Sequence, residues 1–197
     1  MILETTRELL SKHGYEGTTV RDVAQQANVA KGTLYNIYGG KDELIYSAVI
    51  DVRDDVTNRM LDLDPRPGLD SILKADQAVI EQIVRTPTYA EAISRALFGA
   101  PPAKMLIPSL ITTPIELTQR QLETAKELGE IEPAVDSHML ARQLVMQRWG
   151  IIMALSLQQI SVDDLTLDAS HAMVRILQSV ALPDARAMLE GYLRDAN

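Results

Sequence analysis

The chain has 197 residues and a formal net charge of −8, and 46% of its residues are hydrophobic. This length allows one or two folded domains, and the composition is ordinary for a globular protein. No apolar run approaches the roughly 18 residues that span a bilayer, and the charged start of the chain does not resemble a signal peptide. The chain has no cysteine, which excludes disulfides, thiolate metal sites and cysteine nucleophiles. We therefore expect a cytoplasmic protein.

The acidic charge is unevenly distributed along the chain. Residues 1–47 carry six acidic and five basic side chains, so this segment is near −1 and the other −7 lies beyond it. Phosphate binding depends on where the cations point rather than on their sum. No basic stripe is visible, however, so the charge by itself does not suggest a nucleic-acid partner.

In chain order, the sequence predicts helix after helix. Apolar residues recur at helical spacing from the start, and no run alternates as a strand does. The first helix is expected to end at residues 13–17, and a long helix that begins near Asp42 is broken by the turn at residues 64–68. Further turns are predicted at residues 86–87, 99–102, 129–133 and 160–164. We expect an all-α fold of about nine helices, or ten if residues 184–195 form a last one.

The most informative segment runs from Gly17 to Leu44. Thr19 and Asp22 have the spacing of a capping box, so a short helix should begin near Thr19. Asn28 tolerates positive φ and suits a tight turn into a second short helix at about residues 30–38. Two short helices joined in this way form a DNA-reading unit.

The faces of the second short helix are predicted from the same pattern. Leu34 and either Ile37 or Tyr38 can face inward, which leaves the small and polar side chains available outward. Such residues at the start of the second helix are typical of a helix that contacts base edges.

This segment resembles the TetR family of bacterial regulators. The matching stretches are Gly14-Tyr15, Thr18-Thr19-Val20-Arg21-Asp22-Val23-Ala24, Ala27-Asn28-Val29-Ala30-Lys31-Gly32-Thr33-Leu34-Tyr35, and the single residues Tyr38, Lys41, Glu43 and Leu44. They cover nearly all of the first 50 residues, and beyond them the likeness is only architectural. The resemblance implies a three-helix helix-turn-helix DNA-binding domain at residues 1–46, with the motif at about 19–38. It also implies a larger helical ligand-binding and dimerisation domain at residues 47–197.

The resemblance also implies which residues contact DNA. The second short helix should enter the major groove, with its first residues near base edges or phosphates, and the flanking residues should set the register on phosphates. The implied contacts are Thr18, Thr19, Ala30, Lys31, Gly32, Thr33, Tyr35, Asn36 and Lys41. A core role for Tyr35 and a solvated role for Lys31 or Lys41 are the alternatives.

Three features depart from the family pattern. Many members have His or Tyr where this chain has Ile37, and Phe where it has Tyr38. Members also tend to begin with a basic arm, whereas here the first helix is expected almost at Met1. These departures leave an alternative function open, in which a homologue with impaired DNA binding serves as a small-molecule sink or a protein partner.

The second domain contains a segment, residues 144–157, that is apolar nearly all round. A helix of this kind must be buried on every side, for example between its own domain and a second subunit. A later segment from residue 169 has apolar residues at i, i+3, i+4 and i+7. In the family, the last two long helices form a four-helix dimer interface. The implied interface residues are Leu144, Ile151, Ile152, Leu155, Met173, Ile176, Leu177 and Val180.

A ligand pocket is expected among the large, adaptable side chains of the middle helices. The candidates are Tyr89, Arg95, Phe98, Met105, Met146, Trp149 and Met153, with an ordinary core role as the alternative for each. Arg95 and Arg148 suit an anionic ligand group, although pairing with a carboxylate is the alternative for both.

Metal and catalytic chemistry are not expected. The three histidines are scattered singly, and Asp51, Asp54 and Asp55 are typical of a solvated acidic face. Phosphate-binding loops, dinucleotide fingerprints and protease or hydrolase motifs are missing. The sequence therefore predicts no enzyme, no cofactor and no metal. It favours a ligand-responsive transcriptional regulator, in most relatives a repressor, which binds a palindromic operator as a homodimer and is released by a small apolar effector.

Overall fold

The structure is a computed structural model that describes residues 1–98 and 104–195, without the side chains of Asp54, Arg95 and Asp195. Ten α-helices and two short helical turns make up this part of the chain. Its only β-type pairing is an isolated bridge between Ile131 and Ala181. The predicted all-α fold is confirmed, and so is a last helix, α10 (Pro183–Asp195).

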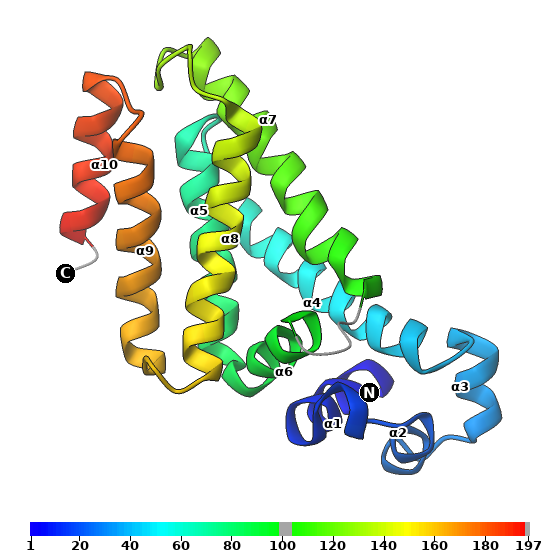
Figure 1. Ribbon diagram of the computed structural model, residues 1–197. Coiled ribbons are helices and arrows are strands. Elements are labelled where there is room, and N and C mark those ends of the chain that lie inside the picture. The colour runs from blue at the N-terminus through cyan, green and yellow to red at the C-terminus, as the bar shows by residue number, and fades with distance from the viewer. Residues whose placement is uncertain (99–103, 196–197) are drawn as a thin grey trace.

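The first three helices form a small domain of their own, drawn in blue in Figure 1. They are α1 (Ile2–Gly17), α2 (Val20–Gln26) and α3 (Lys31–Tyr38). Their shared core contains Leu9, Val20, Val23, Leu34 and Leu44, each no more than 6% exposed. Gly14 has a φ of 68°, which breaks the regular helix near the predicted end of α1.

The fourth helix, α4 (Lys41–Asp62), leads from this small domain into the larger one (Figure 1). The larger domain is built from α5 (Leu69–Arg85), α6 (Pro87–Phe98), η1 (Lys104–Leu106), η2 (Pro108–Thr112), α7 (Thr113–Glu127), α8 (Ser137–Ser156), α9 (Val162–Gln178) and α10. The domain boundary predicted at residue 46 falls inside α4, so the two domains share this helix.

The central helix of the larger domain is α8. It packs against α6, α7 and α9, and this explains why residues 144–157 are apolar nearly all round. Leu144, Val145 and Ile152 are almost completely buried within the chain. The neighbouring α9 begins with a capping box between Ser161 and Asp164, at the turn predicted for residues 160–164.

One apolar core joins the two domains. It includes Leu10 of α1, Ile45 and Val49 of α4, Tyr89 of α6 and Trp149 of α8. The two domains are further connected by an ion pair of 2.5 Å between Arg7 on α1 and Asp51 on α4. A displacement of α6 or α8 is therefore expected to move α1 and α4 as well, because close-packed interiors transmit strain.

Asp70 stabilises the start of α5 against the C-terminal helix. Its buried carboxylate accepts hydrogen bonds from the Arg66 amide at 2.8 Å and from the Tyr192 hydroxyl of α10, and it pairs with Lys74 at 3.0 Å. Burial by itself raises the pKa of Asp70, but these hydrogen bonds and Lys74 outweigh it and hold the pKa below the usual value.

Asp70→Asn is therefore expected to cost about 1–3 kcal/mol of unfolding free energy at pH 7. The folded-state pKa is depressed, so the contribution of the carboxylate is full above the unfolded value of about 3.9 and is lost as the pH falls through the folded value. Urea unfolding at pH 7 and near pH 3 measures this. The cost should shrink at low pH, whereas the exposed control Asp168→Asn should stay within about 0.5 kcal/mol at both. An Asp70→Asn cost that grows on acidification contradicts the assignment.

Candidate nucleic-acid interface and ligand cavity

The turn between α2 and α3 is built by local hydrogen bonds. Thr19 caps α2 by accepting from the Asp22 amide at 3.2 Å, as its spacing predicted. Asn28 has a φ of 52°, and the Val29 amide donates to the Ala24 carbonyl at 3.0 Å. Leu34 is 1% exposed and fixes α3 on the domain core. The orientation of α3 is therefore set by residues outside its exposed face.

The exposed face of α3 carries most of the predicted DNA contacts. Six of the nine lie there or at the residue before the helix, and all six are exposed: Ala30, Lys31, Gly32, Thr33, Tyr35 and Asn36. The Lys31 ammonium lies 5.5 Å from the centre of the Tyr35 ring. Tyr35 is 45% exposed, so it is free of the core role that was its alternative.

The three flanking candidates differ from one another. Thr19 is exposed, but its hydroxyl caps α2. Thr18 is 1% exposed, and its hydroxyl donates to the Gly14 carbonyl at 2.7 Å. This burial corrects the expectation that Thr18 contacts phosphate. Lys41 lies 4.7 Å from the Tyr15 ring and donates to the Glu16 carbonyl at 3.3 Å, so its ammonium is held at the end of α1.

Thr18→Val is expected to destabilise the protein by about 0.5–1.5 kcal/mol, because it leaves the Gly14 carbonyl without its donor. Denaturant unfolding measures the change, and Thr18→Ser, which keeps the hydroxyl, is the matched control. DNA affinity of folded Thr18→Val should equal that of the wild type. A selective loss of DNA affinity at unchanged stability would restore Thr18 as a phosphate contact.

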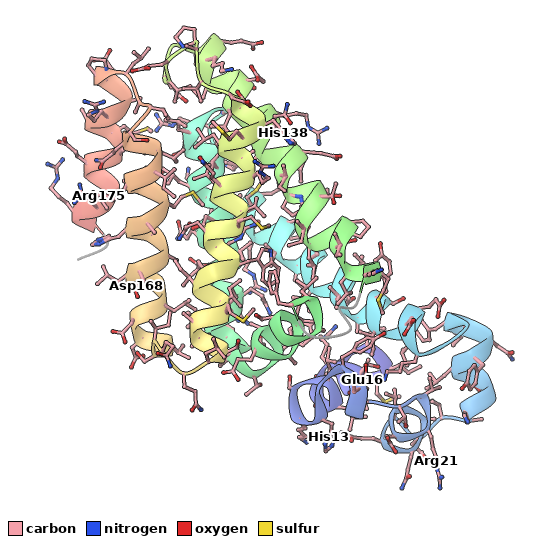
Figure 2. All side chains as sticks on the ribbon, viewed as in Figure 1. His13, Glu16, Arg21, His138, Asp168 and Arg175 are labelled. Carbon is pink, nitrogen blue, oxygen red and sulfur yellow. The ribbon has the colours of Figure 1, made fainter. Side chains whose placement is uncertain are left out.

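Two exposed residues were not among the predicted contacts. Either Ile37 or Tyr38 was predicted to face inward from α3. Ile37 is 58% exposed, whereas Tyr38 is partly buried and is therefore the inward-facing residue. Arg21 projects from α2 into solvent (Figure 2) and has no ion-pair partner in the described part of the chain.

A cavity of about 470 Å³, partly open to solvent, lies in the larger domain, and its volume is within the range of small-molecule sites. Residues of α4, α5, α6, η2, α7 and α8 line it. Its wall is mainly apolar and includes Val52, Val56, Met60, Val79, Leu117 and Ile152.

Of the six predicted pocket residues whose side chains the structure describes, two, Tyr89 and Trp149, line this cavity. The other described candidates lie elsewhere, so these predictions are wrong for it. Phe98 is exposed and meets the Trp149 ring edge-on at 5.9 Å. Met153 contacts Ser94 on α6, and Met146 is exposed on α8. Met105 packs against the core from η1, and the Arg95 side chain lies outside the described residues.

A buried ion pair lies beside the cavity. Arg148 of α8 lines the wall, and its guanidinium is 3.4 Å from the carboxylate of Asp76 on α5. Asp76 is 4% exposed and does not line the wall. Burial raises the pKa of Asp76, and Arg148 offsets part of this rise. Arg148 therefore pairs with a carboxylate, that of Asp76, which was the alternative to binding an anionic ligand group.

Most of the predicted dimer residues are buried within the single chain. Leu144, Ile152, Leu155, Met173 and Leu177 are all 4% exposed or less, so they belong to the chain's own core and have no surface for a second subunit. Ile151, Ile176 and Val180 are partly buried. The exposed apolar residues on α8 are instead Met139 and Met146, on the face that also carries Gly150, and Leu157 is exposed just after the helix.

No helix in the described residues has the length and apolar character needed to cross a membrane. The same residues contain no group of three or more His, Asp or Glu side chains that is arranged to hold a metal ion.

A helix-turn-helix domain joined through one shared helix to a larger helical domain defines a class of DNA-binding transcriptional regulators. Residues 2–48 match the family model of bacterial regulatory proteins, tetR family. This match covers the N-terminal domain, which is therefore a TetR-family DNA-binding domain.

The relatives agree with this assignment. The transcriptional regulator UidR of Escherichia coli is 22% identical over 175 residues, which cover 87% of this chain and 85% of UidR. The transcriptional repressor KstR of Rhodococcus jostii is 33% identical over 99 residues, 50% of this chain and 47% of KstR. Among solved structures, the fatty acid degradation regulator FadR of Bacillus halodurans has a TM-score of 0.78 at 15% identity, covering 91% of this chain and 97% of FadR. Proteins with these names are regulators, not enzymes.

Proposed function

We propose that the protein is a ligand-responsive repressor that binds a palindromic operator as a homodimer and releases it when a small apolar molecule enters the cavity. The observation that carries this proposal is the position of α4. This helix begins three residues after α3 ends, and its later residues Val49, Val52 and Val56 line the cavity. One rigid element thus joins the exposed face of α3 to the effector site.

The exposed face of α3 is the proposed DNA-reading surface. Lys31 and Thr33 at its start, with Tyr35 and Asn36 beyond, offer donors to phosphates and base edges, and an Asn side chain can pair with adenine in two hydrogen bonds. A Cβ atom added at Gly32 would meet no neighbouring atom within 4 Å, so packing inside the protein does not require glycine there. The missing side chain permits a close approach of the α3 backbone to DNA.

The proposed dimer surface is the outward face of α8, defined by Met139, Met146 and Gly150, together with Leu157 just after this helix and Leu167 of α9. The spacing of the three α8 residues, seven and four, keeps them on one side of the helix. Met139, Met146 and Leu157 are 37–61% exposed, and Leu167 is 39% exposed. Gly150 leaves open space for a partner helix. Two copies joined here place two α3 helices on one DNA molecule.

Release follows from the shared core. A ligand in the cavity pushes on α4 and on Tyr89, which belongs to the same apolar core as Leu10 and Ile45. The ligand shifts the spacing of the α3 helices only through its unequal affinity for the two arrangements, and a coupling of about 1–3 kcal/mol is typical. Repression is favoured because relatives such as KstR carry that name.

Selection of DNA from a random-sequence pool by the purified protein tests the proposal. We expect enrichment of an inverted repeat whose half-sites lie about one helical turn, roughly 10 base pairs, apart. Enrichment of a single unrepeated half-site contradicts dimeric binding. Failure to enrich any sequence contradicts the regulator and favours the alternative of a small-molecule sink.

A further inference from the structure

The polar groups on the cavity wall are mostly satisfied within the protein. Thr57 donates to the Arg53 carbonyl at 3.0 Å, Thr86 donates to the Gln82 carbonyl at 2.9 Å, and Trp149 Nε1 donates to the Leu110 carbonyl at 3.1 Å. The Gln82 side chain accepts from Arg59 and donates to Thr86. A ligand therefore meets an apolar wall with few open hydrogen-bonding groups.

Arg148 is the main exception. Its side chain is 13% exposed, it lines the cavity, and its one ion-pair partner in the described part of the chain is Asp76, through Nη1. A guanidinium has five N–H donors, so several remain for a ligand. Asp76 lies behind the wall and supplies the compensating negative charge. The pair presents donors to the cavity but carries no net charge.

We propose that the cavity selects an uncharged, mainly apolar molecule whose carbonyl oxygen accepts a hydrogen bond from Arg148, and that Asp76 causes the rejection of carboxylates. The inference rests on the proposed function and adds the chemical class of the effector.

The charge of the Arg148–Asp76 pair distinguishes carboxylate ligands from uncharged carbonyl ligands. A ligand carboxylate would place a second anion beside Asp76 and leave one uncompensated negative charge in an apolar site, which is costly. A ketone, ester or lactone carbonyl takes the same donors and adds no charge. Arg53, the other guanidinium on the wall, is exposed and already has an interaction partner within the chain.

Methyl decanoate and decanoate are suitable probes, because they share one chain and differ mainly in charge at pH 8. Trp149 is the single tryptophan of the chain and lines the cavity, so its fluorescence reports occupancy directly. We expect the wild type to bind the ester at least about tenfold more tightly than the acid. Equal or tighter binding of decanoate, or no saturable binding of the ester, overturns the proposal.

Asp76→Asn separates this preference from the greater apolarity of the ester. It leaves Arg148 as an uncompensated cation, so the ratio of ester to acid affinity should fall at least about tenfold. Asp70→Asn makes the same change on the same helix away from the cavity, and it should leave the ratio unchanged. If Asp76→Asn keeps the wild-type ratio, Asp76 is not the cause. Should this variant not fold, the double variant Asp76→Asn/Arg148→Gln should lose about tenfold of ester affinity, and an unchanged affinity would exclude Arg148 as the donor.

The fluorescence titration needs no DNA, and the DNA selection described above needs no ligand. Loss of ester binding in a protein that still selects an inverted repeat therefore removes only this inference. Ester binding by a protein that selects no DNA removes the proposed repressor and leaves the cavity assignment standing.

Discussion

Replacing Lys31 and Tyr35 together by alanine is expected to weaken operator binding by roughly a thousandfold while leaving the fold intact. A homodimer loses four contacts, and at about 1 kcal/mol each their sum of about 4 kcal/mol corresponds to that factor. Both side chains are exposed, and their mutual cation–π contact on a solvated surface is worth about 0.5–1 kcal/mol. Fluorescence anisotropy with labelled operator measures the affinity, and thermal unfolding checks the fold.

The salt dependence gives a second readout of the same variant. Loss of one lysine–phosphate contact from each subunit should reduce the slope of log affinity against log salt by about 2. Lys126→Ala on α7 is the matched control, because it removes the same charge from the other domain and should change neither affinity nor slope. An affinity of the double variant within about threefold of the wild type would show that α3 is not the reading helix.

Met146→Glu is expected to convert the dimer to monomers and to lower operator affinity by about 10²–10⁴-fold. A buried, unpaired glutamate on each side of the α8 surface is costly, and the two half-sites then lose the advantage of a linked pair. Light scattering gives the mass in solution, and anisotropy gives the DNA affinity. Leu128→Glu, which places the same charge at an exposed leucine beyond α7, should leave both unchanged.

The interface residues predicted from the sequence make a contrasting case. Leu144 is completely buried in the chain's own core, so Leu144→Ala should cost about 2–5 kcal/mol of unfolding free energy and leave the folded protein dimeric. If folded Leu144→Ala is monomeric and Met146→Glu is dimeric, the dimer interface lies on the face of α8 that the sequence predicted and not on the proposed one.

Local signals made the small domain predictable. The Thr19–Asp22 cap, the positive φ of Asn28 and the buried Leu34 are each determined by residues a few positions apart, so the sequence predicts them without knowledge of distant contacts. Thr18 was the exception. Its burial depends on the hydrogen bond to Gly14 and on how α1 packs against α2, which the spacing of residues does not reveal.

Long-range packing explains the errors in the larger domain. Residues 144–157 are apolar nearly all round, so periodicity does not tell which face of α8 meets its own domain. Met146 was assigned to the cavity and Ile152 to the dimer surface, whereas Met146 is exposed and Ile152 lines the cavity. Much of the cavity wall comes from α4 and α5. Valines at these positions are typical of any helix face that packs on a core. Only the tertiary arrangement places them around a cavity, so the sequence does not identify them as its wall.

The most direct test of the central claim is binding of the purified protein to DNA fragments that flank its own gene, titrated over a range of salt. We predict tight binding to one fragment, with affinity that falls steeply as salt rises and that is lost in the Lys31→Ala/Tyr35→Ala variant. Weak binding of equal strength to every fragment, unchanged in that variant, would contradict a regulator that reads DNA through α3.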